Sequence, residues 1–196
     1  MPVLSYALLR GRCRACATPI SVLYPTLELL TALVVVTCAI VYGPTLRAAT
    51  AAFFVIVLVA VSAIDFRHRI VPNRIILPAT VVLLVAQTLR EPSLEWPLAG
   101  AAAFAFFFLA ALAYPAGMGM GDVKLALFLG VGLGRSVAVA LMVGMFAGLV
   151  PSVVLFCRHG SRARKMGFPF APFLALGGVV ALFFGHAVLR WYLGLT

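Results

Sequence analysis

The chain contains only two aspartates, Asp65 and Asp122, and these are the residues with the clearest chemical potential. Two carboxyl groups that meet at a partly dry site do not both ionise easily, so they share one proton. One can then act as a base toward a water molecule while the other acts as an acid toward a scissile carbonyl. The pair is therefore a candidate for the hydrolysis of a peptide bond.

The residues next to Asp122 favour this chemistry. Asp122 follows glycines at positions 117, 119 and 121, in the segment 117–124 (GMGMGDVK). Because glycine has no side chain, a peptide backbone could approach the carboxyl group closely. We therefore take Gly119 and Gly121 as candidate substrate-binding residues, together with Lys124.

Each aspartate also has a purely structural interpretation. Asp65 lies in the basic segment 63–73 (AIDFRHRIVPN), where it could pair with Arg67 or Arg69. Asp122 precedes an apolar run and could cap a helix. Taken singly, neither residue decides between the two interpretations.

The composition indicates the environment in which these carboxyls lie. Of the 196 residues, 64% are hydrophobic and 10% are charged, against about 25% charged residues in ordinary soluble domains. A soluble fold of this size cannot bury so much apolar surface. A nucleic-acid-binding module is excluded as well, although the net charge is +10. The chain is predicted to be a polytopic membrane protein in contact with the lipid bilayer.

The predicted fold class is all-α, because no alternation with period two appears and lipid leaves backbone groups no other partners. We predict about seven spans, of which the third and the fifth are short, and we expect the fifth to be a half-buried helix held by its neighbours. The positive-inside rule places the N-terminus in the cytoplasm, because most of the 15 lysines and arginines then lie on that side. Residues 1–25 would form a short basic cytoplasmic segment and residues 26–196 the transmembrane domain. The spans are residues 26–42, 47–64, 75–89, 96–115, 123–133, 136–156 and 171–191.

This topology places Asp65 and Asp122 at the same cytoplasmic boundary of the membrane. Glu91 and Glu95 fall in an external loop beside Arg90, where we expect a solvated turn.

Residues 119–125 (GMGDVKL) resemble the GxGD signature of the type IV prepilin peptidases, which are bacterial membrane aspartic proteases. Segments 4–32, 64–73 and 168–174 are similar to that family in the same order. The resemblance implies that Asp65 and Asp122 are the catalytic pair of a multi-pass enzyme in the bacterial inner membrane. It also implies that the substrate is a prepilin or pseudopilin, cut after its short basic leader on the cytoplasmic side.

The chain departs from the longer family members, which begin with another span and a further CxxC pair. It carries only Cys13 and Cys16 in this pattern, and a structural zinc ion takes four ligands. We therefore expect no metal site within the chain, with Cys13 and Cys16 as the candidates if zinc is bound. Many family members also methylate the new N-terminus. No cofactor is expected for cleavage, and S-adenosylmethionine only if methyl transfer occurs.

A small proton-coupled transporter is the alternative. Such proteins carry ionisable groups near the middle of the bilayer, often on broken helices of repeated halves. The sequence shows neither a carboxylate at mid-depth nor an internal repeat, so the peptidase is favoured.

Overall fold

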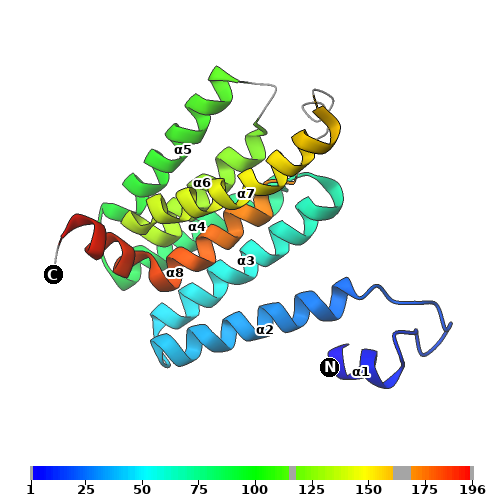
Figure 1. Cartoon of the computed structure of the whole chain (residues 1–196). Coiled ribbons are helices and arrows are strands. Elements are labelled where there is room, and N and C mark those ends of the chain that lie inside the picture. The colour runs from blue at the N-terminus through cyan, green and yellow to red at the C-terminus, as the bar shows by residue number, and fades with distance from the viewer. Residues whose placement is uncertain (1, 115–117, 161–168, 195–196) are drawn as a thin grey trace. The chain divides into compact units, whose positions relative to one another are not determined.

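The computed structural model describes residues 2–114, 118–160 and 169–194, and its regular elements there are helices (Figure 1). No strand is formed within these ranges, which confirms the all-helical prediction. The elements are α1 (Pro2–Leu8), α2 (Leu23–Tyr42), α3 (Leu46–His68), α4 (Asn73–Arg90), α5 (Glu95–Ala113), α6 (Met120–Leu133), the 3₁₀ helix η1 (Gly134–Ser136), α7 (Val137–His159) and α8 (Ala171–Leu193).

The seven predicted spans correspond to helices α2 to α8. Among the described residues, five stretches are long and apolar enough to cross a membrane. Four lie in α2, α3, α5 and α8, and the fifth is a run of 39 residues over α6 and all but the last residue of α7. Helix α4, with 18 residues, is shorter and less apolar than these helices and is not among the stretches. Helix α1 was not predicted, and the predicted end of one span at Pro115 falls outside the described residues. The protein is a multi-pass membrane protein.

The chain forms two compact units, Met1–Ile56 and Val57–Thr196. In the first unit, α1 packs against α2, and Gly11 adopts a positive φ of 72° as the chain leaves α1. The functional division that we predict at residue 25 is a division by charge and hydropathy, and it stays a prediction.

In the second unit, two antiparallel helix pairs are packed through glycines. A Cβ atom at Gly130 of α6 would meet the backbone of Ala99 and Gly100 in α5. A Cβ atom at Gly177 of α8 would meet the backbone of Ala140 in α7. Small residues allow helix backbones to approach closely in membranes, where van der Waals packing drives helix association.

Helix α6 is central in this unit, since it contacts α4, α5, α7 and α8. Most of its residues are buried, which agrees with the expectation of a short helix held by its neighbours. The chain reverses direction after α6 at Gly134, whose φ is 56°. Gly121, at the start of the helix, lies next to Val71, and the Gln87 side chain near the end of α4 bonds to Gly132 near the end of α6. Helices α4 and α6 therefore run in the same direction.

Candidate active site

Asp65 lies in the last turn of α3, and its side chain is held by the beginning of α8. The residue is only 6% exposed. Its Oδ2 atom accepts a hydrogen bond of 3.2 Å from the backbone N–H of Ala171, the first residue of α8. The first N–H groups of a helix have no partner within the helix, so this bond satisfies a donor and orients the carboxylate. Pro172 at the second position favours a helix start here.

Asp122 lies in the first turn of α6, at the same end of the unit. Its backbone N–H donates to the carbonyl oxygen of Gly119 at 3.1 Å. The carboxyl group is close enough to Asp65 for the two to interact electrostatically. The structure thus brings together the two aspartates that the sequence singled out. Arg69 also interacts electrostatically with Asp65, so the charge pairing considered from the sequence contributes to this environment.

The loop between α3 and α4 packs directly on the start of α6. A Cβ atom at Gly121 would lie 2.9 Å from the Cβ atom of Val71. The space that the missing side chain of Gly121 leaves is therefore occupied by Val71 of the protein itself. At Gly119, a Cβ atom would meet its nearest neighbour, Asp122 Oδ2, at an ordinary distance of 3.9 Å. Gly119 is exposed and leaves room beside Asp122, whereas Gly117 lies outside the described residues.

Lys124 connects α6 to α4. Its Nζ atom donates a hydrogen bond of 2.8 Å to Oδ1 of Asn73, the first residue of α4. Together with the contact between Val71 and Gly121, this bond fixes the segment after Asp65 against the helix that carries Asp122. Sequence analysis did not single out Asn73. The sequence does carry one signal for this residue: Asn73 is polar and directly follows Pro72 at the start of a helix.

We expect the Lys124–Asn73 bond to couple the two residues energetically. In a double-mutant cycle, Lys124→Met and Asn73→Ala should each lower the free energy of unfolding. The double variant should lose about 1 kcal/mol less than the sum of the single losses, because either change alone removes the bond. Thermal or denaturant unfolding of the purified protein in detergent measures these values. Arg74→Met, at the neighbouring exposed position, is the control and should show no coupling to Lys124→Met. Strictly additive effects at Lys124 and Asn73 would contradict this role.

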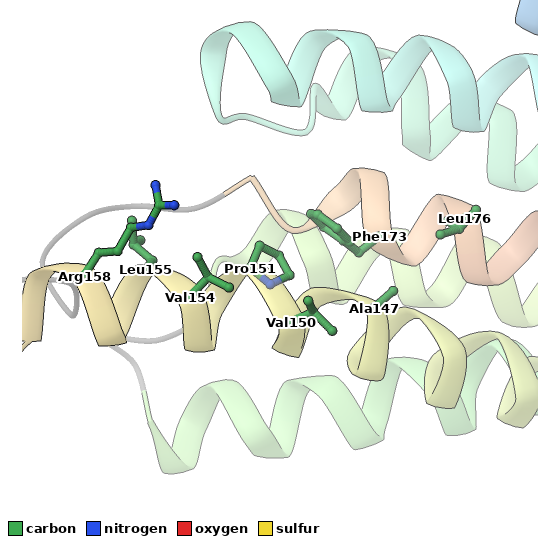
Figure 2. Close-up of a pocket in the computed structure, with 8 residues that line it drawn as sticks. All are labelled: Ala147, Val150, Pro151, Val154, Leu155, Arg158, Phe173 and Leu176. Carbon is green, nitrogen blue, oxygen red and sulfur yellow. The ribbon is translucent and has the colours of Figure 1, made fainter.

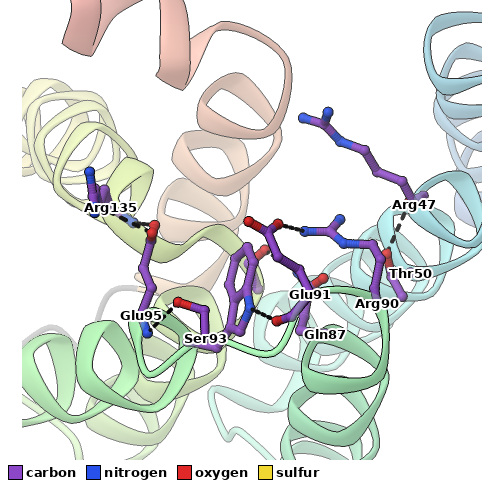
Figure 3. Close-up of polar contacts among 10 residues, drawn as sticks. Arg47, Thr50, Gln87, Arg90, Glu91, Ser93, Glu95 and Arg135 are labelled. Atoms are coloured by element: carbon purple, nitrogen blue, oxygen red, sulfur yellow. Dashed lines mark hydrogen bonds and ion pairs between the residues drawn. The ribbon is translucent and has the colours of Figure 1, made fainter.

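The opposite end of the second unit is closed by a polar network (Figure 3). The backbone N–H of Arg135 donates to Oε1 of Glu95 at 2.9 Å, and the Arg135 side chain forms an ion pair with the same carboxylate at 3.3 Å. Glu91 is exposed and pairs with Arg90 at 3.6 Å. The solvated turn that we expected is correct for Glu91. Glu95 instead connects α5 to the turn between α6 and α7, because the chain turns at Gly134 directly beside its carboxylate.

Cys13 and Cys16 lie in a tight turn of the first unit. The backbone N–H of Cys13 donates to the carbonyl of Thr18 at 2.9 Å, and the Cys16 thiol lies 3.1 Å from the Thr18 hydroxyl. Hydrogen bonds with Thr18 and then Cys13 lower the pKa of the exposed Cys16 thiol. Two thiols supply half of a tetrahedral zinc site. Among the described residues, no group of three or more cysteine, histidine or acidic side chains surrounds a common point.

Comparisons with known proteins give a consistent result. Residues 52–156 match the type IV leader peptidase family, and residues 1–42 match the bacterial peptidase A24 N-terminal domain. A prepilin leader peptidase/N-methyltransferase of Aeromonas hydrophila is 35% identical, over 98% of this chain and 69% of its own length. Proteins with the same name from Bacillus subtilis and Legionella pneumophila are 32% and 28% identical, and the matches cover 79% and 70% of their lengths and 98% and 99% of this chain. No solved structure matches the chain significantly.

Proposed function

Because the chain belongs to the type IV leader peptidase family, we propose that it removes the leader peptide from prepilins or pseudopilins, with Asp65 and Asp122 as its catalytic pair. The enzyme is a membrane protease of the bacterial inner membrane. The observation that carries the assignment of the pair is the packing of the segment after Asp65 on the start of α6, which places both aspartates at one end of the helix bundle. None of the comparisons favours a transporter.

The proposed reaction is a direct attack by water on the peptide carbonyl. One carboxylate takes a proton from the water as the new C–O bond forms, and the protonated carboxyl donates its proton to the carbonyl oxygen. Breakdown of the tetrahedral intermediate breaks the C–N bond, and the leaving amine takes up a proton. The N–H of Ala171 supports this proposal, since it holds Asp65 in one orientation before substrate arrives.

The family to which the chain belongs indicates the nature of the substrate. A prepilin carries a hydrophobic helix behind its short basic leader, so it can reach the enzyme within the bilayer while the leader stays in the cytoplasm. The positions of both aspartates at helix ends support cleavage at the membrane boundary. The predicted orientation, with the N-terminus inside, makes this boundary the cytoplasmic one.

Cleavage can be tested in a host that lacks its own prepilin peptidase. The chain is co-expressed with a prepilin, and mass spectrometry of the pilin N-terminus reports removal of the leader. We expect the shortened pilin to appear only when the chain is present. Full-length prepilin beside a stably inserted chain would contradict the proposed activity.

Two substitutions in the glycine motif should have different effects. Gly121→Ala places a methyl group against Val71, so it should displace the α3–α4 loop and lower both kcat and the melting temperature. Gly119→Ala adds a methyl group on an open side next to Asp122, so it should raise KM without changing the melting temperature. Cleavage kinetics with a synthetic prepilin peptide and thermal unfolding measure both effects. A melting temperature that is lowered equally by both substitutions would contradict these different roles of Gly119 and Gly121.

Methyl transfer is not part of this proposal, although the relatives are also named N-methyltransferases. The cavity between α1 and the start of α2 has a volume of about 160 Å³ and an almost entirely apolar lining that includes Tyr6, Leu9 and Ile20. Cofactor sites in proteins typically measure about 300–1,000 Å³ and provide convergent polar groups. This cavity does not fit S-adenosylmethionine.

A further inference from the structure

An apolar groove lies between α7 and α8, and neither Asp65 nor Asp122 is among its lining residues (Figure 2). Its volume is about 750 Å³, within the range of small-molecule sites in proteins. Among the residues that the structure describes around the groove, Arg158, in the last turn of α7, is the charged one in its lining. The other lining residues are Ala147, Val150, Pro151, Val154, Leu155, Phe173 and Leu176.

The groove follows from how the two helices are paired. Gly144 and Gly148 of α7 pack closely on the start of α8, where Leu174 and the preceding residue Phe170 meet them. Beyond Gly148, α7 continues to His159, whereas α8 has its first residue at Ala171. Pro151 lies in this last part of α7 and has no N–H to donate to the carbonyl of Ala147. This end of α7 therefore presents an apolar face that α8 covers only in part.

The dimensions of the groove fit the acyl chain of one lipid. From Ala147 to Arg158, the helix rises by about 16 Å, which is roughly half of the 30 Å hydrocarbon core of a bilayer. The lining residues of α7 thus extend over the depth of one leaflet. Arg158 stands at the end of the groove where a headgroup would lie (Figure 2).

We propose that this groove binds an anionic phospholipid of the cytoplasmic leaflet, with an acyl chain along α7 and the headgroup phosphate at Arg158. The charge of Arg158 selects this occupant. Basic side chains at this level attract anionic headgroups, whereas the hydrophobic helix of a prepilin, with its basic leader, would bring like charges together. Val150 and Val154 of its lining are exposed on the outside of the helices, so lipid can reach the groove.

Native mass spectrometry of the protein, released from bilayers of phosphatidylcholine and phosphatidylglycerol, tests the proposal. The wild-type protein should retain phosphatidylglycerol in preference to phosphatidylcholine. Arg158→Gln should reduce this preference about fivefold, as expected for the loss of one interfacial charge. Arg190→Gln removes an exposed arginine near the end of α8 that does not line the groove, and it should leave the preference unchanged.

A second pair of variants tests the apolar part of the site. Val154→Trp fills the groove and should reduce the retention of both lipids, whereas Val153→Trp, at an exposed neighbour outside the lining, should not. An unchanged preference for phosphatidylglycerol in Arg158→Gln would overturn the proposal. So would normal lipid retention in Val154→Trp combined with a loss of prepilin cleavage, since that result would assign the groove to the helix of the substrate.

Discussion

Replacement of Asp65 or Asp122 by asparagine is expected to reduce prepilin cleavage by at least about a hundredfold. General acid–base catalysis contributes about 10²–10⁴-fold, and an asparagine can neither accept a proton from water nor donate one as a carboxyl does. Because the two aspartates are proposed to work as one unit, the double variant should be no less active than either single variant. Quantitative mass spectrometry of the pilin N-terminus gives the rates.

Folding must be separated from catalysis in this experiment. Glu91→Gln makes the same chemical change at an exposed carboxylate of the opposite end, and it should cleave prepilin at the wild-type rate. The level of each variant in the membrane and its melting temperature should stay near those of the wild type. Wild-type cleavage by a well-inserted Asp65→Asn or Asp122→Asn variant would rule out this catalytic pair.

Gly177→Ala is expected to cause the largest loss of stability. The added methyl group would overlap the carbonyl oxygen of Ala140 and lie 2.8 Å from the backbone nitrogen of Gly144. Backbone atoms cannot turn aside as a side chain does, so α7 and α8 must separate. Overpacking of this kind costs about 1–3 kcal/mol, and we expect the upper part of that range. Unfolding in detergent micelles measures the loss.

The control for this substitution lies on the same helix. Ala187 is on an exposed part of α8, so Ala187→Val adds more volume than Gly177→Ala but has open space for it. We expect its free energy of unfolding to stay within about 0.5 kcal/mol of the wild type, as is usual for surface positions. If Gly177→Ala were as stable as Ala187→Val, the close approach of α7 and α8 would not contribute to stability.

The helices were predictable because lipid imposes a simple rule. A segment that crosses the bilayer must be apolar, long enough and helical, so runs such as 47–64 and 171–191 identified α3 and α8 without knowledge of their neighbours. Helix α1 has only seven residues and carries no such signal. The candidate catalytic pair could also be predicted from the sequence, because a chain with two aspartates offers few alternatives.

The packing around the two aspartates could not be predicted from the sequence. The hydrogen bond between Lys124 and Asn73 depends on which helices are neighbours, and hydropathy carries no information on this point. Gly121 illustrates the same limit. The sequence suggested that its missing side chain left space for a peptide, whereas in the fold Val71 fills that space. Interactions between segments distant in the sequence require the three-dimensional arrangement.

The backbone donor that holds Asp65 has a consequence for how mutational scans of this protein should be read. Ala171 provides its main-chain N–H, which every amino acid except proline possesses. An alanine scan would therefore pass over this position, since it is already alanine, and most single-nucleotide changes would leave the donor in place. This backbone donor of the proposed site is thus retained in most genetic variants, and replacement of side chains does not reveal its role. Only a replacement of the amide itself, for example by an ester through chemical or genetic-code methods, would reveal its contribution.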